Sequence, residues 1–158
     1  MYEADLTRAL ILNPNFIEEG LTFKGREVVL SGKRCDLLFE DRYGNDLYVE
    51  VKLDVKDKAV GQLMRYDVLV NDPNARFMSV GFTFLDCLKD GLIKRGFEYK
   101  EVSEATIASY LSIYNSVSFK EFNKHKAQQT KSIEGLYREI ELLKSENSTF
   151  KKKFNFLL

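Results

Sequence analysis

Residues 32–52 read GKRCDLLFEDRYGNDLYVEVK, and this stretch has the pattern of a β-hairpin. Strand-like apolar residues fill positions 35–40 and return at positions 47–53, where Val49 and Val51 alternate with more polar neighbours. Residues 42–46 lie between them, and Gly44 with its neighbour asparagine tolerates the positive φ of a tight turn. The spacing therefore predicts two antiparallel strands joined by a short loop.

The second strand of this hairpin carries an unusual pair of charges. Glu50 and Lys52 are two residues apart, so they share one face of an otherwise apolar strand. Burying a carboxylate or an ammonium is costly unless the group has a partner or a purpose. A three-residue loop centred on Gly44 would set Asp36 opposite Lys52, on the same face. This register would bring Asp36, Glu50 and Lys52 together.

Two carboxylates and the carbonyl of Val51 would form an oxygen-rich site for a hard divalent cation, Mg²⁺ with Mn²⁺ as a substitute. Such an ion keeps several waters, so it could hold both a phosphate and an attacking water, while Lys52 stabilises the developing charge. The other interpretation is an ion pair inside a hairpin that contributes little to stability. Spacing alone does not separate the two.

The remainder of the chain alternates between helical and strand-like patterns. Residues 20–25 are expected to form a turn. Further helices are predicted over 2–12, 57–70 and 86–95 and from 103, and further strands over 27–30, 76–84 and 97–102. This order predicts an α/β fold in which a mixed β-sheet is flanked by helices.

Three motifs carry a family resemblance: GKRCDLLFEDRYG at 32–44, LYVEVK at 47–52 and AVGQLMRY at 59–66. Together they resemble the PD-(D/E)xK nuclease superfamily and, within it, the catalytic domain of NucS/EndoMS-type endonucleases, over residues 2–103. The resemblance implies a restriction-endonuclease-like fold and a Mg²⁺-dependent DNA endonuclease. Cys35 replaces the proline of the superfamily motif. NucS-type enzymes also carry a separate N-terminal DNA-binding domain, whereas this sequence begins at the nuclease helix, so mismatch or flap specificity is not expected to transfer.

The resemblance also implies roles for single residues. Asp36 and Glu50 would bind the metal with the Val51 carbonyl, and Lys52 would position the water. Gln62 would contact the site or the DNA backbone, and Glu3 would either complete the metal shell or position a ligand or water. Three further residues have two interpretations each: Tyr66 supports the site or simply packs, and Arg34 and Arg65 contact phosphates or are solvated surface charges.

Composition narrows the class of protein. The 158 residues include 24 basic and 24 acidic side chains, so a globally basic nucleic-acid binder is not indicated. Cys35 and Cys87 make neither a disulfide framework nor a metal-ligand spacing, which favours the reducing cytoplasm. The acidic N-terminus does not resemble a secretory signal. No apolar run approaches the roughly 20 residues of a membrane-spanning helix.

The charge is unevenly distributed. Residues 1–118 carry 15 basic against 19 acidic side chains, and residues 119–158 carry 9 against 5. Glycine and proline are almost confined to the first part. We therefore expect a nuclease domain over residues 1–115 and a basic C-terminal helix over residues 116–158.

The C-terminal segment has a heptad repeat. The a positions are Ile133, Ile140, Asn147 and Phe154, and the d positions are Leu136, Leu143, Phe150 and Leu157. Isoleucine at a, leucine at d and a single asparagine at a favour a parallel two-stranded coiled coil, and hence a homodimer. The alternative is a helix that lies on its own nuclease domain. The lysines at 151–153 (Lys151, Lys152 and Lys153) are a solvated face or a DNA-binding patch, and His125 is expected at the surface.

The leading hypothesis is thus a dimeric, Mg²⁺-dependent endonuclease that hydrolyses DNA phosphodiester bonds. One alternative is a Holliday-junction resolvase or restriction-type nuclease. A second is a non-catalytic nuclease-fold subunit that binds DNA or assembles with a partner. The complete set of Asp36, Glu50, Lys52 and Gln62 argues against the second alternative, because a pure binding protein does not need all four.

Overall fold

The computed structural model describes the backbone of residues 1–155 and the side chains of residues 1–145. The chain forms two compact units, Met1–Ser112 and Ile113–Leu158. The last helix, α4 (Glu104–Asn155), contributes its first turns to the first unit and the rest to the second.

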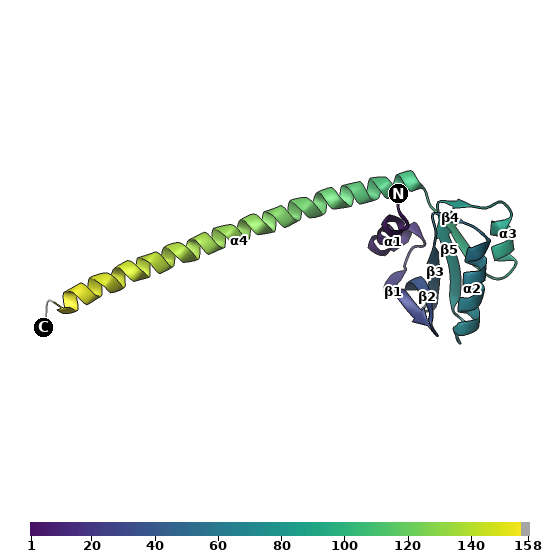
Figure 1. The fold of residues 1–158 in the computed structure, drawn as a ribbon, viewed down its shortest axis with the longest axis horizontal. Helices are drawn as coiled ribbons and strands as arrows, with labels where there is room; N and C mark the ends of the chain where they lie inside the picture. Colours follow the sequence, from purple (N-terminus) through teal and green to yellow (C-terminus); the bar gives the residue numbers. More distant parts are fainter. Residues whose placement is uncertain (156–158) are drawn as a thin grey trace. The chain divides into compact units, whose positions relative to one another are not determined.

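A five-stranded mixed sheet is the centre of the first unit (Figure 1). Its strand order is β1-β2-β3-β5-β7; the first three strands are antiparallel, and β3, β5 and β7 run parallel. The strands are β1 (Thr22–Leu30), β2 (Lys33–Glu40), β3 (Asp46–Val51), β5 (Arg76–Gly81) and β7 (Glu98–Glu101). Two short strands, β4 (Asp54–Val55) and β6 (Thr83–Phe84), form a separate small sheet. The predicted α/β fold with a mixed sheet is confirmed.

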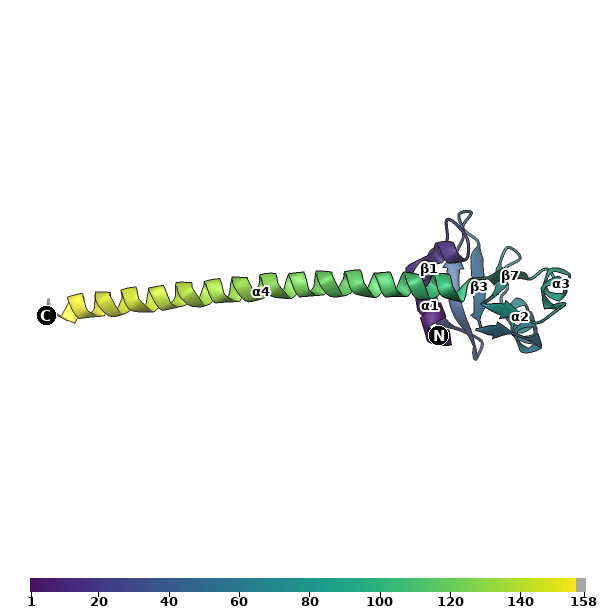
Figure 2. The ribbon, with the colours of Figure 1, turned by 90° about the horizontal axis from the view of Figure 1, so that it is seen from above.

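Helices cover both faces of this sheet (Figures 1 and 2). The helix α1 (Glu3–Leu12), followed by a 3₁₀ turn at Pro14–Phe16, packs on one face with the first turns of α4. The helices α2 (Asp57–Leu69) and α3 (Leu88–Ile93) pack on the other face. They are the crossovers that parallel neighbours require.

Two apolar cores result, one on each side of the sheet. Val49 and Val51 of β3 belong to the core beneath α1, whereas Tyr48 belongs to the core beneath α2. Glu50 follows the same alternation as Tyr48, so its side chain faces α2 and is only 1% exposed. The period of two along β3 thus carries a carboxylate into the interior.

The turn predicted over residues 20–25 is wrong from Thr22 onward. Those residues pair with β2, beginning with Thr22 opposite Glu40, and Phe23 packs edge-on against Phe39. Gly20 does turn the chain, with a φ of +86°. The pairing register shifts between Phe23 and Gly25, so this glycine belongs to an irregularity within the strand and not to a loop.

The predicted register of the β2–β3 hairpin is also wrong, by two residues. Leu37 pairs with Val49, which sets Asp36 level with Glu50 and not with Lys52. The three loop residues are centred on Tyr43, and Gly44 takes the last position with a φ of +84°. A left-handed final residue is typical of three-residue hairpin loops.

Arg76 joins three parts of the first unit. Its guanidinium lies 2.6 Å from a carboxylate oxygen of Glu18, 3.2 Å from one of Asp41 and 2.7 Å from one of Glu98. The segment before β1, the hairpin loop and the edge strand β7 are therefore held by one side chain. Bidentate hydrogen bonds between charged groups are stronger than hydrogen bonds between neutral groups.

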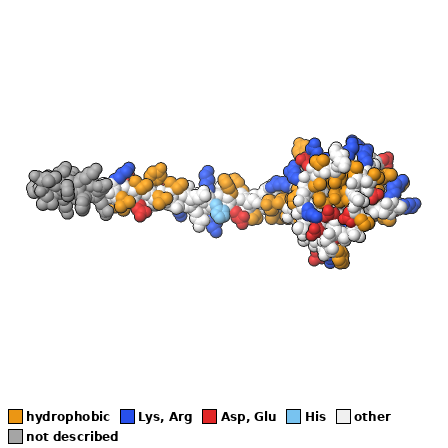
Figure 3. All heavy atoms as spheres, turned by 90° about the horizontal axis from the view of Figure 1, so that it is seen from below, with side chains coloured by type: hydrophobic (Ala, Val, Ile, Leu, Met, Phe, Trp, Pro, Cys, Tyr) orange, Lys and Arg blue, Asp and Glu red, His pale blue; other side chains and the backbone are white. Residues whose placement is uncertain are grey.

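In the second unit, α4 carries exposed apolar side chains between charged ones (Figure 3). The seam predicted from the heptads includes Ile133, Leu136, Ile140 and Leu143, which are between 46% and 59% exposed. His125 is exposed, as expected. Asn147, Phe150 and the lysines at 151–153 lie outside the described side chains. Within the described residues, no helix has the length and hydrophobicity to cross a membrane.

Candidate functional site

Four oxygen atoms surround the ammonium group of Lys52. The Nζ atom lies 2.8 Å from the carbonyl oxygen of Val51, 2.9 Å from Oε1 of Glu50, 3.3 Å from Oε1 of Glu3 and 3.6 Å from Oδ2 of Asp36. These groups come from the start of α1, from β2 and from the end of β3. The fold thus brings together five of the six residues that the sequence analysis suggested for the catalytic and metal site, and the sixth, Gln62, lies on α2.

Lys52 follows the last residue of β3, and its backbone N–H donates to the carbonyl of Val80 at 3.0 Å. This bond extends the β3–β5 pairing by one residue and fixes where the side chain begins. Burial lowers the pKa of Lys52, but its contact with Glu50 and the charges of Asp36 and Glu3 outweigh burial and raise the pKa overall. The group at the centre of the site is therefore a charged ammonium.

A tyrosine on the helix α2 holds the side chain of Glu50. The hydroxyl of Tyr66, on α2, lies 2.6 Å from Oε2 of Glu50 and 2.8 Å from the carbonyl oxygen of Arg34. Burial raises the pKa of the Glu50 carboxyl, and the hydrogen bond from Tyr66 opposes this shift. Tyr66 is itself 2% exposed, so it both packs in the core and fixes the carboxylate.

Asp36 is oriented by the backbone of the neighbouring strand. Its Oδ2 accepts a hydrogen bond from the N–H of Val51 at 2.8 Å. Its other oxygen, Oδ1, accepts no hydrogen bond from the described residues, and the side chain is 31% exposed. Asp36 therefore has a fixed orientation and a lone pair open to a ligand.

Buried polar atoms without a hydrogen-bond partner gather on the α2 side of the sheet. In the described part of the chain they are Oε1 of Glu50, which meets Lys52 only as an ion pair, Oε1 of Gln62 and Oγ of Ser79. Gln62 lies one turn before Tyr66 on α2, and Ser79 is paired with Glu50 across β3 and β5. Buried polar groups are normally satisfied, so these three atoms leave hydrogen-bonding capacity for water or a polar ligand on this side of the sheet.

Ser79 was not predicted from the sequence. A serine within an apolar strand has no distinctive pattern, and only the parallel register of β5 sets it beside Glu50. Cys35 belongs to the apolar core on the α2 side of the sheet. It is fully buried, its thiol donates to the carbonyls of Leu37 and Val49, and burial raises its pKa to about 12.

The oxygen atoms that could bind a hard cation come from two carboxylates and one backbone carbonyl. Among the described residues, no group of three His, Cys, Asp or Glu side chains is arranged to hold a metal ion. Asp36 and Glu50 offer two carboxylates, and the carbonyl of Val51 is a third oxygen that Lys52 now contacts. Mg²⁺ commonly binds one or two protein carboxylates and retains water, so these residues fit it.

The two predicted phosphate-binding arginines lie apart from these carboxylates. The guanidinium of Arg34 is exposed and faces the carboxylate of Glu27 at 3.7 Å. Arg65 lines a groove on the outer side of α2, together with Lys33 and Met64. Neither side chain contacts the carboxylate cluster in the described part of the chain.

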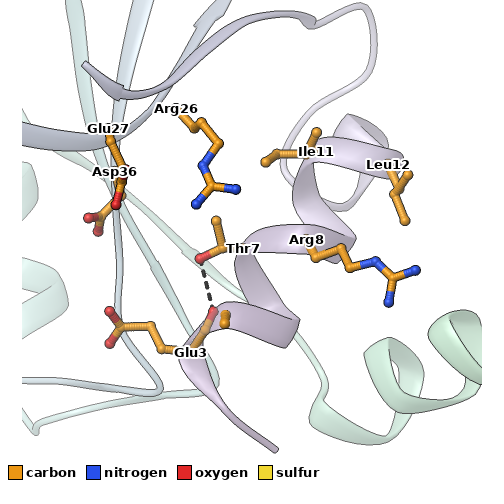
Figure 4. Close-up of a pocket in the computed structure, with 9 residues that line it drawn as sticks. Glu3, Thr7, Arg8, Ile11, Leu12, Arg26, Glu27 and Asp36 are labelled. Atoms are coloured by element: carbon orange, nitrogen blue, oxygen red, sulfur yellow. Dashed lines mark hydrogen bonds between the residues drawn. The ribbon is translucent and has the colours of Figure 1, made fainter.

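A cavity of about 440 Å³ adjoins the cluster, between α1 and the strands β1 and β2 (Figure 4). Glu3 and Asp36 belong to both the cluster and the cavity wall. Arg26 and Glu27 of β1 also line it, and neither was predicted as a site residue. Neighbouring residues in a regular strand point to opposite faces of the sheet. Alternation along the sequence would therefore place Arg26 and Glu27 on different faces and would not predict that both line this cavity.

Comparison with known proteins gives one family and a small set of structures. The family described as "Endonuclease NucS C-terminal domain" matches residues 2–82. No curated protein matches the chain significantly. Among solved structures, a complex of EndoMS with double-stranded DNA has a TM-score of 0.60 and 26% identity, covering 64% of this chain and 44% of that one.

Two other structures give similar values. A repair endonuclease from Pyrococcus abyssi has a TM-score of 0.58 and 29% identity, covering 65% of this chain and 47% of its own. EndoMS in its apo form has a TM-score of 0.56 and 25% identity, with the same two coverages of 65% and 47%. This chain therefore spans less than half the length of each of these three structures.

Proposed function

The chain belongs to the family of endonuclease NucS C-terminal domains, and from this premise we propose that it is a metal-dependent DNA endonuclease. It would hydrolyse phosphodiester bonds through the cluster of Asp36, Glu50 and Lys52, in the manner of the PD-(D/E)xK superfamily. The observation that carries this proposal is the convergence of the carboxylates of Asp36 and Glu50 on the ammonium of Lys52, at 3.6 Å and 2.9 Å.

Mg²⁺, or Mn²⁺ in its place, would be held by Asp36, Glu50 and the carbonyl of Val51. The open Oδ1 of Asp36 supports this assignment, as does Oε1 of Glu50, whose contact among the described residues is the ion pair with Lys52. When bound, the ion supplies charge to activate water and to stabilise the phosphate being cut. Tyr66 holds Glu50 in orientation throughout.

The other residues act around this centre. Lys52 carries a positive charge to stabilise the negative charge that builds up on the phosphate. Gln62 directs a buried, unpartnered oxygen that would accept a hydrogen bond from a bound water. Glu3 completes the ring of oxygens from α1. Arg34 and Arg65 are proposed as more distant phosphate contacts.

DNA is the proposed substrate, and the C-terminal helix is proposed to make a homodimer. The exposed apolar seam on α4 supports dimerisation, because parallel coiled coils bury this pattern. Two nuclease domains would then cut opposite strands of one duplex or junction. Sedimentation of the full chain and of a form ending at Asn115 tests this: the full chain should be dimeric and the shortened form monomeric. A monomeric full chain would rule out the dimer.

A non-catalytic DNA-binding subunit is the competing function, and one observation favours it. Lys52 already neutralises part of the carboxylate charge, so the cluster is compensated without a metal ion. Incubation with supercoiled, linear, single-stranded, branched and mismatched DNA separates the two functions. Cleavage that requires Mg²⁺ or Mn²⁺ supports the nuclease, and the preferred DNA separates a junction resolvase from a restriction-type enzyme. Binding without cleavage of any of these DNAs would support the subunit.

A further inference from the structure

The strand β1 is irregular at two positions that flank Arg26. On one side, the pairing register with β2 shifts between Phe23 and Gly25. On the other side, Glu27 has a φ of +51°, in the left-handed region that a glutamate rarely adopts. Arg26 itself pairs regularly with Leu37.

These irregularities change where the side chains of β1 point. Alternation along the strand breaks at Arg26 and Glu27, which are both exposed and both line the cavity beside Asp36. A left-handed non-glycine residue costs conformational free energy, and it persists only where the surrounding structure enforces it. Backbone strain of this kind is concentrated at ligand-binding and catalytic sites.

The guanidinium of Arg26 projects into the cavity toward Thr7 of α1 (Figure 4). It makes no hydrogen bond or ion pair with any described residue, whereas its neighbour Glu27 faces Arg34 at 3.7 Å. A guanidinium that lines a cavity without a counter-ion has all its donors available. Planar donors of this type match the oxygens of a phosphate.

We propose that Arg26 binds a phosphate of the DNA strand, next to the phosphodiester that is cut. The inference rests on the proposed nuclease function and adds to it a binding residue that the sequence motifs do not include. The position of this phosphate follows from Asp36, which belongs both to the cluster around Lys52 and to the wall of the cavity. If the reacting phosphate lies at Asp36, the adjoining cavity would receive a neighbouring phosphate of the same strand.

Charge in the cavity agrees with this assignment. Glu3, Glu27 and Asp36 are acidic wall residues, so an anion would be repelled unless cations offset them. Arg26 and Arg8 are the two positive charges of the cavity wall, and Arg34 pairs with Glu27 at its edge. A divalent cation at Asp36 would supply the rest. Phosphate binding in the cavity should therefore depend on the divalent ion as well as on Arg26.

The test compares Arg26→Gln with Arg95→Gln in the full chain. Arg95 is an exposed arginine on the α3 side whose guanidinium contacts only a local carbonyl, so it controls for lost positive charge. Binding of a fluorescent mixed-sequence duplex is measured in Ca²⁺ at several salt concentrations. Arg26→Gln should weaken binding about tenfold and lower the slope of log K against log salt by about one. Arg95→Gln should match the parent protein.

Thermal unfolding of the same variants checks the fold. Arg26 has no partner in the described residues, so Arg26→Gln should keep the melting temperature of the parent. A parent-like affinity and salt slope for Arg26→Gln would overturn the inference while leaving the nuclease proposal intact. A parent protein that binds DNA but cuts none with Mg²⁺ or Mn²⁺ would overturn the nuclease proposal, and a parent that does not bind DNA would overturn both.

Discussion

The ammonium of Lys52 lies 2.9 Å from Oε1 of Glu50, a carboxylate that is only 1% exposed. The lysine is thus the counter-ion of a buried negative charge that would otherwise be very costly. The same ammonium contacts the carbonyl of Val51 and lies near Asp36. Lys52 and a divalent cation would therefore share the same oxygens.

Replacing this lysine should alter stability and cation binding together. Removing one partner of a buried ion pair costs about 3–5 kcal/mol, and partial exposure of Lys52 sets the expected loss for Lys52→Met at the lower part of this range. Because the carboxylates then lack a counter-ion, Mn²⁺ should raise the melting temperature of the variant more than that of the parent. An equal rise in both proteins would contradict the shared use of these oxygens.

The hydroxyl of Tyr66 should matter more than that of another buried tyrosine. Tyr66→Phe removes the donor to Glu50, and the expected loss of stability is about 1–3 kcal/mol, with slower cleavage. Tyr48→Phe is the matched control, because Tyr48 is buried on the same face but its hydroxyl bonds to no described residue. Urea unfolding of both variants measures the difference. Equal losses would mean that Tyr66 only packs.

Gln62 should show opposite effects on stability and activity. Its Oε1 is buried without a partner, so Gln62→Leu removes an unsatisfied acceptor and should leave the free energy of unfolding unchanged or raise it by about 1 kcal/mol. Cleavage should nevertheless slow at least about tenfold if this oxygen positions a water, within the range typical of such groups. Unfolding and single-turnover cleavage are measured on one preparation. A stabilised and fully active variant would remove Gln62 from the site.

Acid should destabilise the first unit through the hairpin loop. The N–H of Asn45 donates to Asp41, and with further bonds from Tyr43 and Arg76 it lowers the pKa of Asp41 to about 2. A lowered pKa means that the carboxylate stabilises the fold above its ordinary value near 3.8, and that this stabilisation is lost as the pH falls from about 4 to about 2.

Asp41→Asn should therefore reduce stability at neutral pH and flatten its decline in acid. Asp90→Asn, which alters an exposed carboxylate on α3, is the control and should follow the parent curve. Urea unfolding at several pH values measures both. A parent protein with constant stability across this range would exclude the role assigned to Asp41.

The sequence predicts the centre of the site better than its surroundings. Asp36, Glu50 and Lys52 could be found because strand alternation and their spacing are local properties. The register was wrong because it depends on which loop position takes the left-handed conformation. A slip of two residues keeps every side chain on its face, and so the three groups still met.

The parts that were missed depend on departures from regular structure or on distant pairing. Arg26 lies between two irregular positions of β1, which alternation cannot anticipate. Ser79 reaches Glu50 only through the parallel pairing of β3 with β5. Glu3, which contacts Lys52 from 49 residues away in the chain, was expected at the site only through the family resemblance, because its spacing from the hairpin carries no local signal.

The central claim is that Glu50 and its neighbours form a metal-dependent nuclease centre. The most direct measurement is the rate at which the parent and Glu50→Gln cut a panel of DNA structures in Mg²⁺, with thermal unfolding to establish that both are folded. The account predicts metal-dependent cleavage by the parent and a rate at least about a hundredfold lower for the folded variant. A folded Glu50→Gln protein that cuts DNA as fast as the parent would contradict it.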